Sequence, residues 1–156
     1  MEQVINPTEE IKLTVDYTKT VEQAITDGNY DWKNEDIAAK NFPISLEMIG
    51  KKVEVTTKLF HFNCDISSND TISEMDKGGY HPATLMELLA LGILFPELQR
   101  QFPIVALGSV WRDADSYRFV SYLDVNGSKR ELDLGWFDVD WLALCRFLGV
   151  RKESLL

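Results

Sequence analysis

The stretch YRFVSYLDVNGSKRELDLGWF, residues 117–137, indicates the class of fold at this end of the chain. Its two halves, 117–125 and 129–137, are rich in β-forming residues and flank the dipeptide Asn126-Gly127. That dipeptide is the strongest short signal for a hairpin, because both central residues of a type I′ turn need a positive φ. The stretch therefore predicts two antiparallel strands that are joined by a type I′ turn.

The rest of the chain predicts further strands and three helices around this hairpin. Alternating or buried apolar runs predict strands at 11–17, 51–63, 104–107 and 145–151. Capping-box patterns begin at Thr20, Thr71 and Thr84, which predicts helices at 21–27, from Thr71 to about Gly78, and at 85–95, with one helical turn at 35–40. Residues 67–70 also fit a helix N-cap region. The 85–95 helix is apolar on more than one face, so it should lie in the core. Together these elements predict one α+β domain over residues 1–156.

Composition and charge narrow the classes of partner. The net charge is -9, and residues 1–102 carry 17 acidic and 9 basic side chains against 8 and 7 in 103–156. Such a body repels phosphate, so we expect no nucleic-acid partner. No apolar run is long enough to span a bilayer, and no signal peptide is evident, so cytoplasmic residence is the default, although a virion protein would look the same. Cys64, Cys145, His61 and His81 lack metal-ligand spacing, and we expect neither a metal nor a cofactor.

Three short motifs, in order, carry a resemblance to a known fold. Residues 79–84, Gly-Tyr-His-Pro-Ala-Thr, with Glu87 resemble the Gly-x-Arg-Leu-Pro-Thr-x-x-Glu stretch of the formylglycine-generating-enzyme branch of C-type-lectin-like folds. Residues 108–111, Gly-Ser-Val-Trp, resemble the Gly-Gly-Ser-Trp of that branch, and 146–151, Arg-Phe-Leu-Gly-Val-Arg, resemble its closing Gly-Phe-Arg strand. The resemblance covers about residues 69–152, whereas 1–68 form an N-terminal strand and helix portion of unassigned role.

The resemblance implies both an architecture and a class of function. It implies two helices packed on a small antiparallel sheet, with an irregular C-terminal face of strands and loops. The same branch includes the variable proteins of diversity-generating retroelements, which bind ligands through a hypervariable C-terminal face. The chain is most similar to those proteins, because the enzymes act through a pair of late cysteines and only Cys145 stands late here. We therefore expect residues 111–151 to hold a recognition surface for a protein or other macromolecule, without a chemical step.

The 129–137 strand is expected to have a buried face and an exposed face, since side chains alternate along a strand. Burial of each inward residue contributes on the order of 1.5–3 kcal/mol before entropic costs. The expected inward set is Leu132, Leu134 and Trp136, and the outward set is Glu131, Asp133, Gly135 and Phe137. Phe137 is then an exposed aromatic side chain, which is typical of a contact patch.

From this alternation and the flanking turns we predict the ligand contacts. They are Phe119, Ser121, Tyr122, Asp124, Glu131, Asp133, Gly135, Phe137, Val139, Leu142, Leu144 and Cys145. Four other aromatic side chains are expected to anchor the core: Trp111, Trp136, Trp141 and Phe147. Five arginines are expected to fix the loops through backbone carbonyls and aspartates: Arg112, Arg118, Arg130, Arg146 and Arg151.

Two other classes of function remain open at this point. One is an enzyme, either of the formylglycine-generating kind or a hydrolase that uses Asp138 and Asp140. Aspartates in turns usually accept hydrogen bonds from their own backbone, and this also applies to Asp113 and Asp115. The other is a structural or regulatory protein in which the aromatic patch is an oligomer interface.

Overall fold

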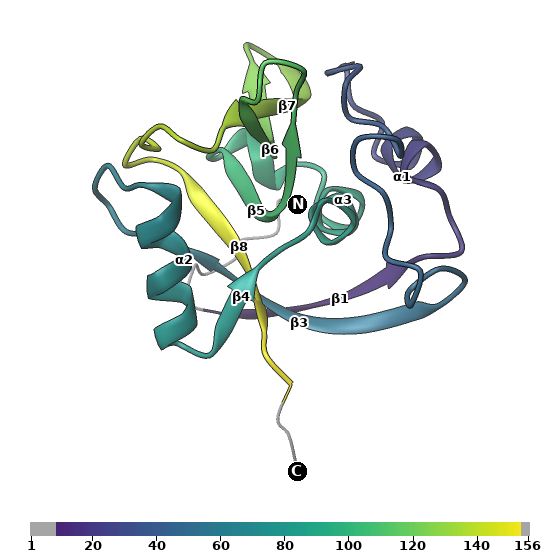
Figure 1. The fold of residues 1–156 in the computed structure, drawn as a ribbon, viewed down its shortest axis with the longest axis horizontal. Coiled ribbons are helices and arrows are strands. Elements are labelled where there is room, and N and C mark those ends of the chain that lie inside the picture. Colours follow the sequence, from purple (N-terminus) through teal and green to yellow (C-terminus); the bar gives the residue numbers. More distant parts are fainter. Residues whose placement is uncertain (1–8, 154–156) are drawn as a thin grey trace.

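A computed structural model describes residues 9–153 of the chain (Figure 1). The elements follow one another as β1 (Glu10–Asp16), α1 (Val21–Asp27), β2 (Trp32–Lys33), β3 (Lys52–Phe60), α2 (Ser68–Lys77), β4 (Tyr80–Pro82), α3 (Leu85–Leu94), the 3₁₀ turn η1 (Leu98–Arg100), β5 (Ile104–Arg112), β6 (Arg118–Asn126), β7 (Lys129–Trp136) and β8 (Arg146–Arg151). The expected α+β class is confirmed. None of the helices in residues 9–153 is long and apolar enough to cross a membrane.

The strands form one sheet that is larger than the small antiparallel sheet expected. Seven of its eight strands lie in the order β1-β3-β8-β5-β6-β7-β2, and the eighth, β4, pairs with β8 off this path. The sheet is mixed, because β5 pairs with β8 in parallel and β2 pairs with β7 in parallel. The first 68 residues account for part of this difference, since they contribute β1, β2 and β3, and β3 pairs directly with the closing strand β8.

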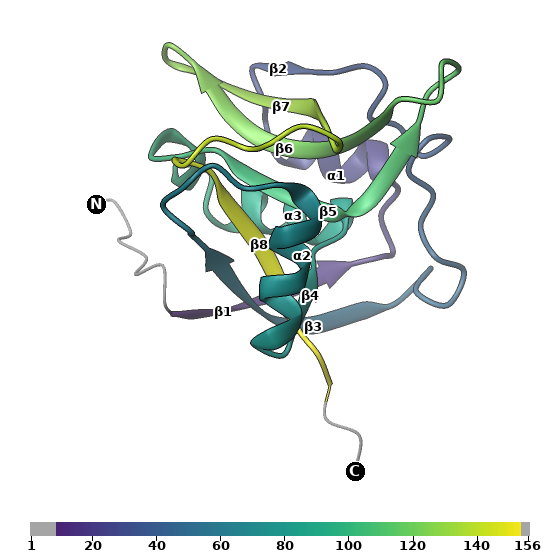
Figure 2. The same ribbon diagram turned by 60° about the vertical axis from the view of Figure 1, so that its left-hand side comes forward.

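Both faces of the sheet are covered, and this decides which side chains are exposed. Figures 1 and 2 show α3 on one side of β8 and α2 on the other. The α3 side holds the larger core, which includes Leu88, Leu123 and Leu132. The α2 side holds a second core: Met75, Tyr80, Val105, Leu107, Val120, Phe137, Trp141, Cys145 and Phe147. At many positions, a side chain on the face of the sheet opposite the larger core is therefore buried in the second core and does not contact solvent.

Local capping explains where the helices begin. Thr20 caps α1 and Thr84 caps α3, each in the reciprocal capping box expected from the sequence. The prediction that α2 begins at Thr71 was wrong, because Ser67 caps this helix by accepting from the backbone N–H of Asp70. Thr71 lies inside the helix, and its hydroxyl donates to the carbonyl oxygen of Ser67. The predicted turn at 35–40 consists of turns and bends without a helix.

The β6–β7 hairpin is confirmed, but its turn is of another type. Asn126 pairs with Lys129, so the two turn residues are Gly127 and Ser128. Gly127 has a φ of 62°, whereas neither Asn126 nor Ser128 has a positive φ. A two-residue turn with a positive φ at its first central position is type II′, and glycine is preferred there. The predicted type I′ turn at Asn126-Gly127 was therefore wrong in type, and its position was wrong by one residue.

Gly108 lets two segments approach closely. Its N–H donates to the carbonyl oxygen of Ala83 at 2.7 Å. A Cβ atom at this position would lie 2.5 Å from the carbonyl oxygens of Ala83 and Pro82, closer than such atoms can approach. The glycine that opens the 108–111 motif thus joins β5 to the turn that precedes α3.

Candidate recognition surface

The loop between β7 and β8, residues 137–145, presents apolar side chains to solvent. Val139, Leu142 and Leu144 are 46%, 61% and 50% exposed. These three residues were expected to contact a ligand, and the structure leaves them accessible for that role. Apolar side chains gathered on one short loop are typical of an interaction site.

Trp141 anchors the middle of this loop. Its ring is buried, and its indole N–H donates to Ser68 Oγ at 2.9 Å. Ser68 Oγ in turn donates to the carbonyl oxygen of Phe137 at 2.7 Å. The backbone of Trp141 also exchanges two hydrogen bonds with Ile66, at 2.8 and 3.1 Å. Because Ser68 is the first residue of α2, the helix and the loop are held together.

Further contacts fix the second half of the loop. The N–H of Ala143 donates to Asp65 Oδ1 at 3.0 Å, and its carbonyl oxygen lies 3.1 Å from His61 Nε2. The guanidinium of Arg146 donates to the carbonyl oxygen of Leu144 at 2.6 Å. The loop backbone is therefore ordered before any ligand arrives, which lowers the entropic cost of binding.

A pocket of about 530 Å³ opens beside the loop. We call it the C-terminal pocket, and its lining comes from residues 99–103, 122–125 and 140–145. Leu142 and Leu144 line it from the loop, and Phe102 lines it from the segment before β5. Tyr122 and Trp141 also line it and meet edge to face, with ring centroids 6.1 Å apart. Its size and mixed apolar and aromatic lining are typical of ligand sites.

The strand face beside this pocket is acidic. Asp124 lies opposite Glu131 and Tyr122 lies opposite Asp133 in the β6–β7 pairing. Like charges at directly opposed positions destabilise a sheet. Burial, followed by the charges of Asp133, Asp124 and Glu131, raises the pKa of Tyr122 to about 12. Tyr122 is therefore a neutral hydroxyl that can donate or accept a hydrogen bond at physiological pH.

We predict that Tyr122 titrates late, at about 12. Its folded pKa is higher than that of an unfolded tyrosine, so this contribution to the free energy of unfolding is present below a pH of about 10 and is lost as the pH rises further. A pH titration followed by phenolate absorbance should show one fewer tyrosine titrating near pH 12 in the Tyr122→Phe variant than in the unmodified protein. Asp133→Asn should lower the pKa of Tyr122. A tyrosine titrating at its ordinary value, lost in the Tyr122→Phe variant, would contradict the prediction.

The structure brings together some of the expected contact residues and separates others. Tyr122, Asp124, Leu142, Leu144 and Cys145 line the C-terminal pocket. Cys145 is nevertheless 7% exposed, and Ser121 is fully buried, so neither is a free contact residue as predicted. Phe119 is half-buried beside Trp111. Glu131, Asp133 and Gly135 are half-buried on β7.

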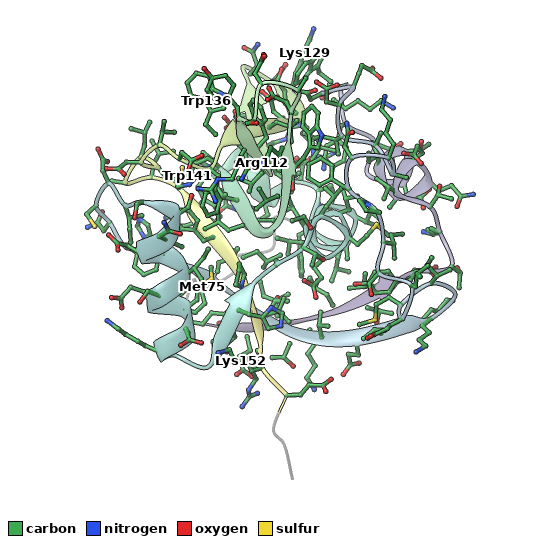
Figure 3. The ribbon with its side chains drawn as sticks, in the orientation of Figure 1. Met75, Arg112, Lys129, Trp136, Trp141 and Lys152 are labelled. Atoms are coloured by element: carbon green, nitrogen blue, oxygen red, sulfur yellow. The ribbon has the colours of Figure 1, made fainter. Side chains whose placement is uncertain are left out.

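Two neighbouring aromatic residues exchange their expected places. Phe137 was expected to face solvent, but it is only 6% exposed and belongs to the second core. Trp136 was expected to anchor the core, but it is 55% exposed and stacks on the exposed Tyr117 at 6.3 Å. The alternation places Phe137 on the correct face of the sheet, and that face is covered by α2 and the 137–145 loop. In Figure 3, Trp136 lies at the periphery and Trp141 lies further in, near β8.

The segment 99–103 was missed as part of the site. It reaches the 137–145 loop because β5 pairs with β8 in parallel, with Ile104 opposite Arg146. The N–H of Arg146 donates to the carbonyl oxygen of Pro103 at 2.9 Å. Parallel pairing between distant segments has no local sequence signal, so this wall of the pocket could not be read from the chain.

The structure shifts the pKa of two groups that were considered for catalysis, the Cys145 thiol and the Asp138 carboxylate. Burial raises the pKa of the Cys145 thiol, which disfavours the reactive thiolate. Asp138 forms an ion pair with Arg118, and this hydrogen bond lowers the pKa of Asp138. Asp113 accepts from the backbone N–H groups of Asp115 and Tyr117, as expected for an aspartate in a turn. Within residues 9–153, histidine, cysteine and acidic side chains form no cluster that could hold a metal ion.

The expected role of the arginines is supported by their contacts. Arg112 donates to the carbonyl oxygen of Ser116, and Arg151 forms an ion pair with Glu10. Arg118 lies over the ring of Phe137 at 4.4 Å as well as pairing with Asp138. These side chains fix loops and strand ends in the C-terminal part of the chain.

Comparison of the chain with protein-family models, with curated proteins and with solved structures finds no match.

Proposed function

We propose that this protein is a non-catalytic ligand-binding protein with a C-type-lectin-like fold. Its binding surface is the C-terminal pocket together with the exposed side chains of the 137–145 loop. The observation that carries the proposal is a pair of exposed leucines, Leu142 and Leu144, lining a hollow whose backbone is held by buried hydrogen bonds. Ordered backbone and free side chains are the requirements for recognition by surface complementarity.

The arrangement of the motifs supports the fold part of the proposal. The chain runs from α2 through the 79–84 turn to α3, then through the 108–111 motif and the hairpin to β8. Each motif has a structural role, since Thr84 and Glu87 cap α3, Gly108 permits a close approach, and β8 pairs with β3. Scaffold residues thus account for the motifs, whereas the exposed side chains of Val139, Leu142 and Leu144 have no such structural role.

Binding is tested with partners selected from a random peptide library displayed on phage. The double substitution Leu142→Ser and Leu144→Ser should weaken the selected peptides by at least about tenfold, since each exposed leucine contributes roughly 1 kcal/mol or more when buried. Its free energy of unfolding should change by no more than about 0.5 kcal/mol. Affinity is measured by isothermal titration, and stability by chemical denaturation.

The matched control is Leu46→Ser, because Leu46 is 87% exposed and lies outside the C-terminal pocket. This variant should bind the selected peptides as well as the unmodified protein does. Equal losses in both variants, or full binding by the double variant, would place the recognition surface elsewhere.

We further propose that the C-terminal coding region is the target of a diversity-generating retroelement. The proposal rests on the resemblance of the motifs and on a scaffold that holds the 137–145 loop without using its outward side chains. The test is the DNA around the gene. A near-copy of its 3′ end that differs mainly at adenines, beside a reverse-transcriptase gene, is the expected finding; its absence would leave a lectin-like binder without diversification.

A further inference from the structure

A second and larger hollow, of about 1040 Å³, lies apart from the C-terminal pocket and shares no lining residue with it. We call it the Glu87 cavity. It opens between the 41–48 segment, β3, the start of α3 and the 108–110 part of β5. The proposed function does not involve this cavity. Gly108, where β5 approaches the turn before α3, is one of its lining residues.

A buried carboxylate lines this cavity. Glu87 is only 6% exposed, and its Oε1 accepts from the N–H of Thr84 at 2.8 Å and from its hydroxyl at 3.1 Å. Within residues 9–153, Oε2 accepts no hydrogen bond. Oε2 is not fully buried, so it remains open to solvent at the wall of the cavity. The helix cap explains one oxygen of Glu87 and leaves the other available.

A buried tyrosine lies in the same place. Tyr17 is 8% exposed and also lines the cavity. Burial raises the pKa of Tyr17, the charge of Glu87 raises it further, and the neighbouring Thr84 hydroxyl lowers it. The hydroxyl and the carboxylate are therefore neighbours at one end of an accessible space.

The remaining lining is both apolar and polar: it includes the carboxylates of Glu54 and Glu153, and its arginine and lysine are already paired. Ile44, Met48, Val53, Val55 and Met86 contribute aliphatic and thioether surface. At the mouth, Arg151 forms an ion pair with Glu10, and Lys152 forms one with Asp76. No basic side chain of residues 9–153 forms an ion pair with Glu87.

We propose that the Glu87 cavity binds a ligand with an apolar body and a protonated amine, and that the amine donates to Glu87 Oε2 while the body lies along the aliphatic lining. A hydrogen bond between two charged groups is about twice as strong as one between neutral groups. An anionic ligand would be repelled by the carboxylate of Glu87. A neutral alcohol would form a weaker hydrogen bond with it, because the donor carries no charge. The chemistry of the cavity thus selects alkylammonium groups, including the side chain of lysine.

The substitution Glu87→Gln tests the charge without removing the helix cap. Glutamine at this position of a capping box also reaches back to the N-cap backbone N–H, so α3 keeps its start. The probes are n-hexylammonium, n-hexanoate and 1-hexanol, and binding is followed by chemical-shift changes in NMR spectra. Hexylammonium should bind best of the three, and Glu87→Gln should weaken it at least tenfold. Tyr17→Phe should weaken it several-fold.

Two controls separate this inference from the proposed function. Glu74→Gln changes an exposed carboxylate on α2 and should leave hexylammonium binding unchanged. The Leu142→Ser and Leu144→Ser variant should also bind hexylammonium normally. The proposal is overturned if hexylammonium fails to bind, if hexanoate binds equally well, or if Glu87→Gln leaves its affinity unchanged. None of these outcomes bears on peptide binding at the C-terminal pocket.

Discussion

Replacement of Phe137 by alanine is expected to lower the free energy of unfolding by about 3–5 kcal/mol, the range for a buried phenylalanine. The ring is 6% exposed and packs in the second core with Met75, Val120 and Phe147. Arg118 covers it at 4.4 Å, so the substitution also removes a cation–π contact. The expected fall in melting temperature is on the order of 10 °C for a chain of this size.

The neighbouring residue supplies the matched control. Trp136→Ala removes a larger ring, but that ring is 55% exposed and contacts the exposed Tyr117. Its cost is expected to be about 1 kcal/mol or less, since only an exposed stacked pair is lost. Denaturant titration of both variants gives the comparison. If Trp136→Ala proves the more costly substitution, the assignment of the two rings is wrong.

These two residues also show what the sequence could reveal about the sheet. Period-two alternation placed Leu132 and Phe137 on opposite faces, and the structure agrees. The error was to treat the second face as solvent. That face is covered because Trp141 pairs with Ile66 and bonds to Ser68, residues far away in the chain. Alternation fixes the side of a strand on which a residue lies, but the cover on that side depends on tertiary contacts.

Local signals were more reliable for the helices. The Thr20 and Thr84 capping boxes each involve residues three positions apart, and both helices begin where they were expected. The candidate box at Thr71 failed because Ser67 offers an earlier cap, and both patterns are present in the sequence. Choosing between two adjacent caps requires knowledge of the packing of α2, where Ser68 is needed beside Trp141.

The candidate site was predictable only in part. Leu142 and Leu144 were expected to be accessible, and the structure exposes both. The segment 99–103 and the Glu87 cavity depend on how distant strands and segments meet. Local sequence patterns do not reveal which distant segments pack together. A pocket whose walls come from three segments therefore cannot be derived from any one of them.

Arg130 is expected to be the most important polar side chain for stability. It is 5% exposed and forms no ion pair with an acidic side chain of residues 9–153. Its guanidinium donates to the carbonyl oxygen of Gly28 at 2.7 Å, where α1 ends, and to that of Gly92 in the last turn of α3 at 3.5 Å. Helix C-termini carry partial negative charge, which stabilises a cation there. The guanidinium also lies 4.7 Å from the ring of Tyr30.

The same side chain connects these helix ends to the back of the C-terminal pocket. Arg130 donates to Gln99 Oε1 at 3.0 Å. The amide of Gln99 donates in turn to the carbonyl oxygens of Asp124 and Glu131, at 2.8 and 3.0 Å. Gln99 and Asp124 both line the pocket. Arg130 therefore supports the wall of the C-terminal pocket without lining it.

Arg130→Met should reduce the free energy of unfolding by about 2–4 kcal/mol, because several buried acceptors lose their donor while the aliphatic volume is largely kept. Arg130→Lys should lose nearly as much, since one ammonium group cannot reach acceptors spread over two helix ends and Gln99. Lys129→Met is the matched control: Lys129 is exposed at the tip of the hairpin (Figure 3), and its loss should cost about 0.5 kcal/mol or less. Chemical denaturation of the three variants decides the matter. Full stability of Arg130→Lys would mean that the charge alone suffices, and that the planar geometry of the guanidinium does not join the helices to the hairpin.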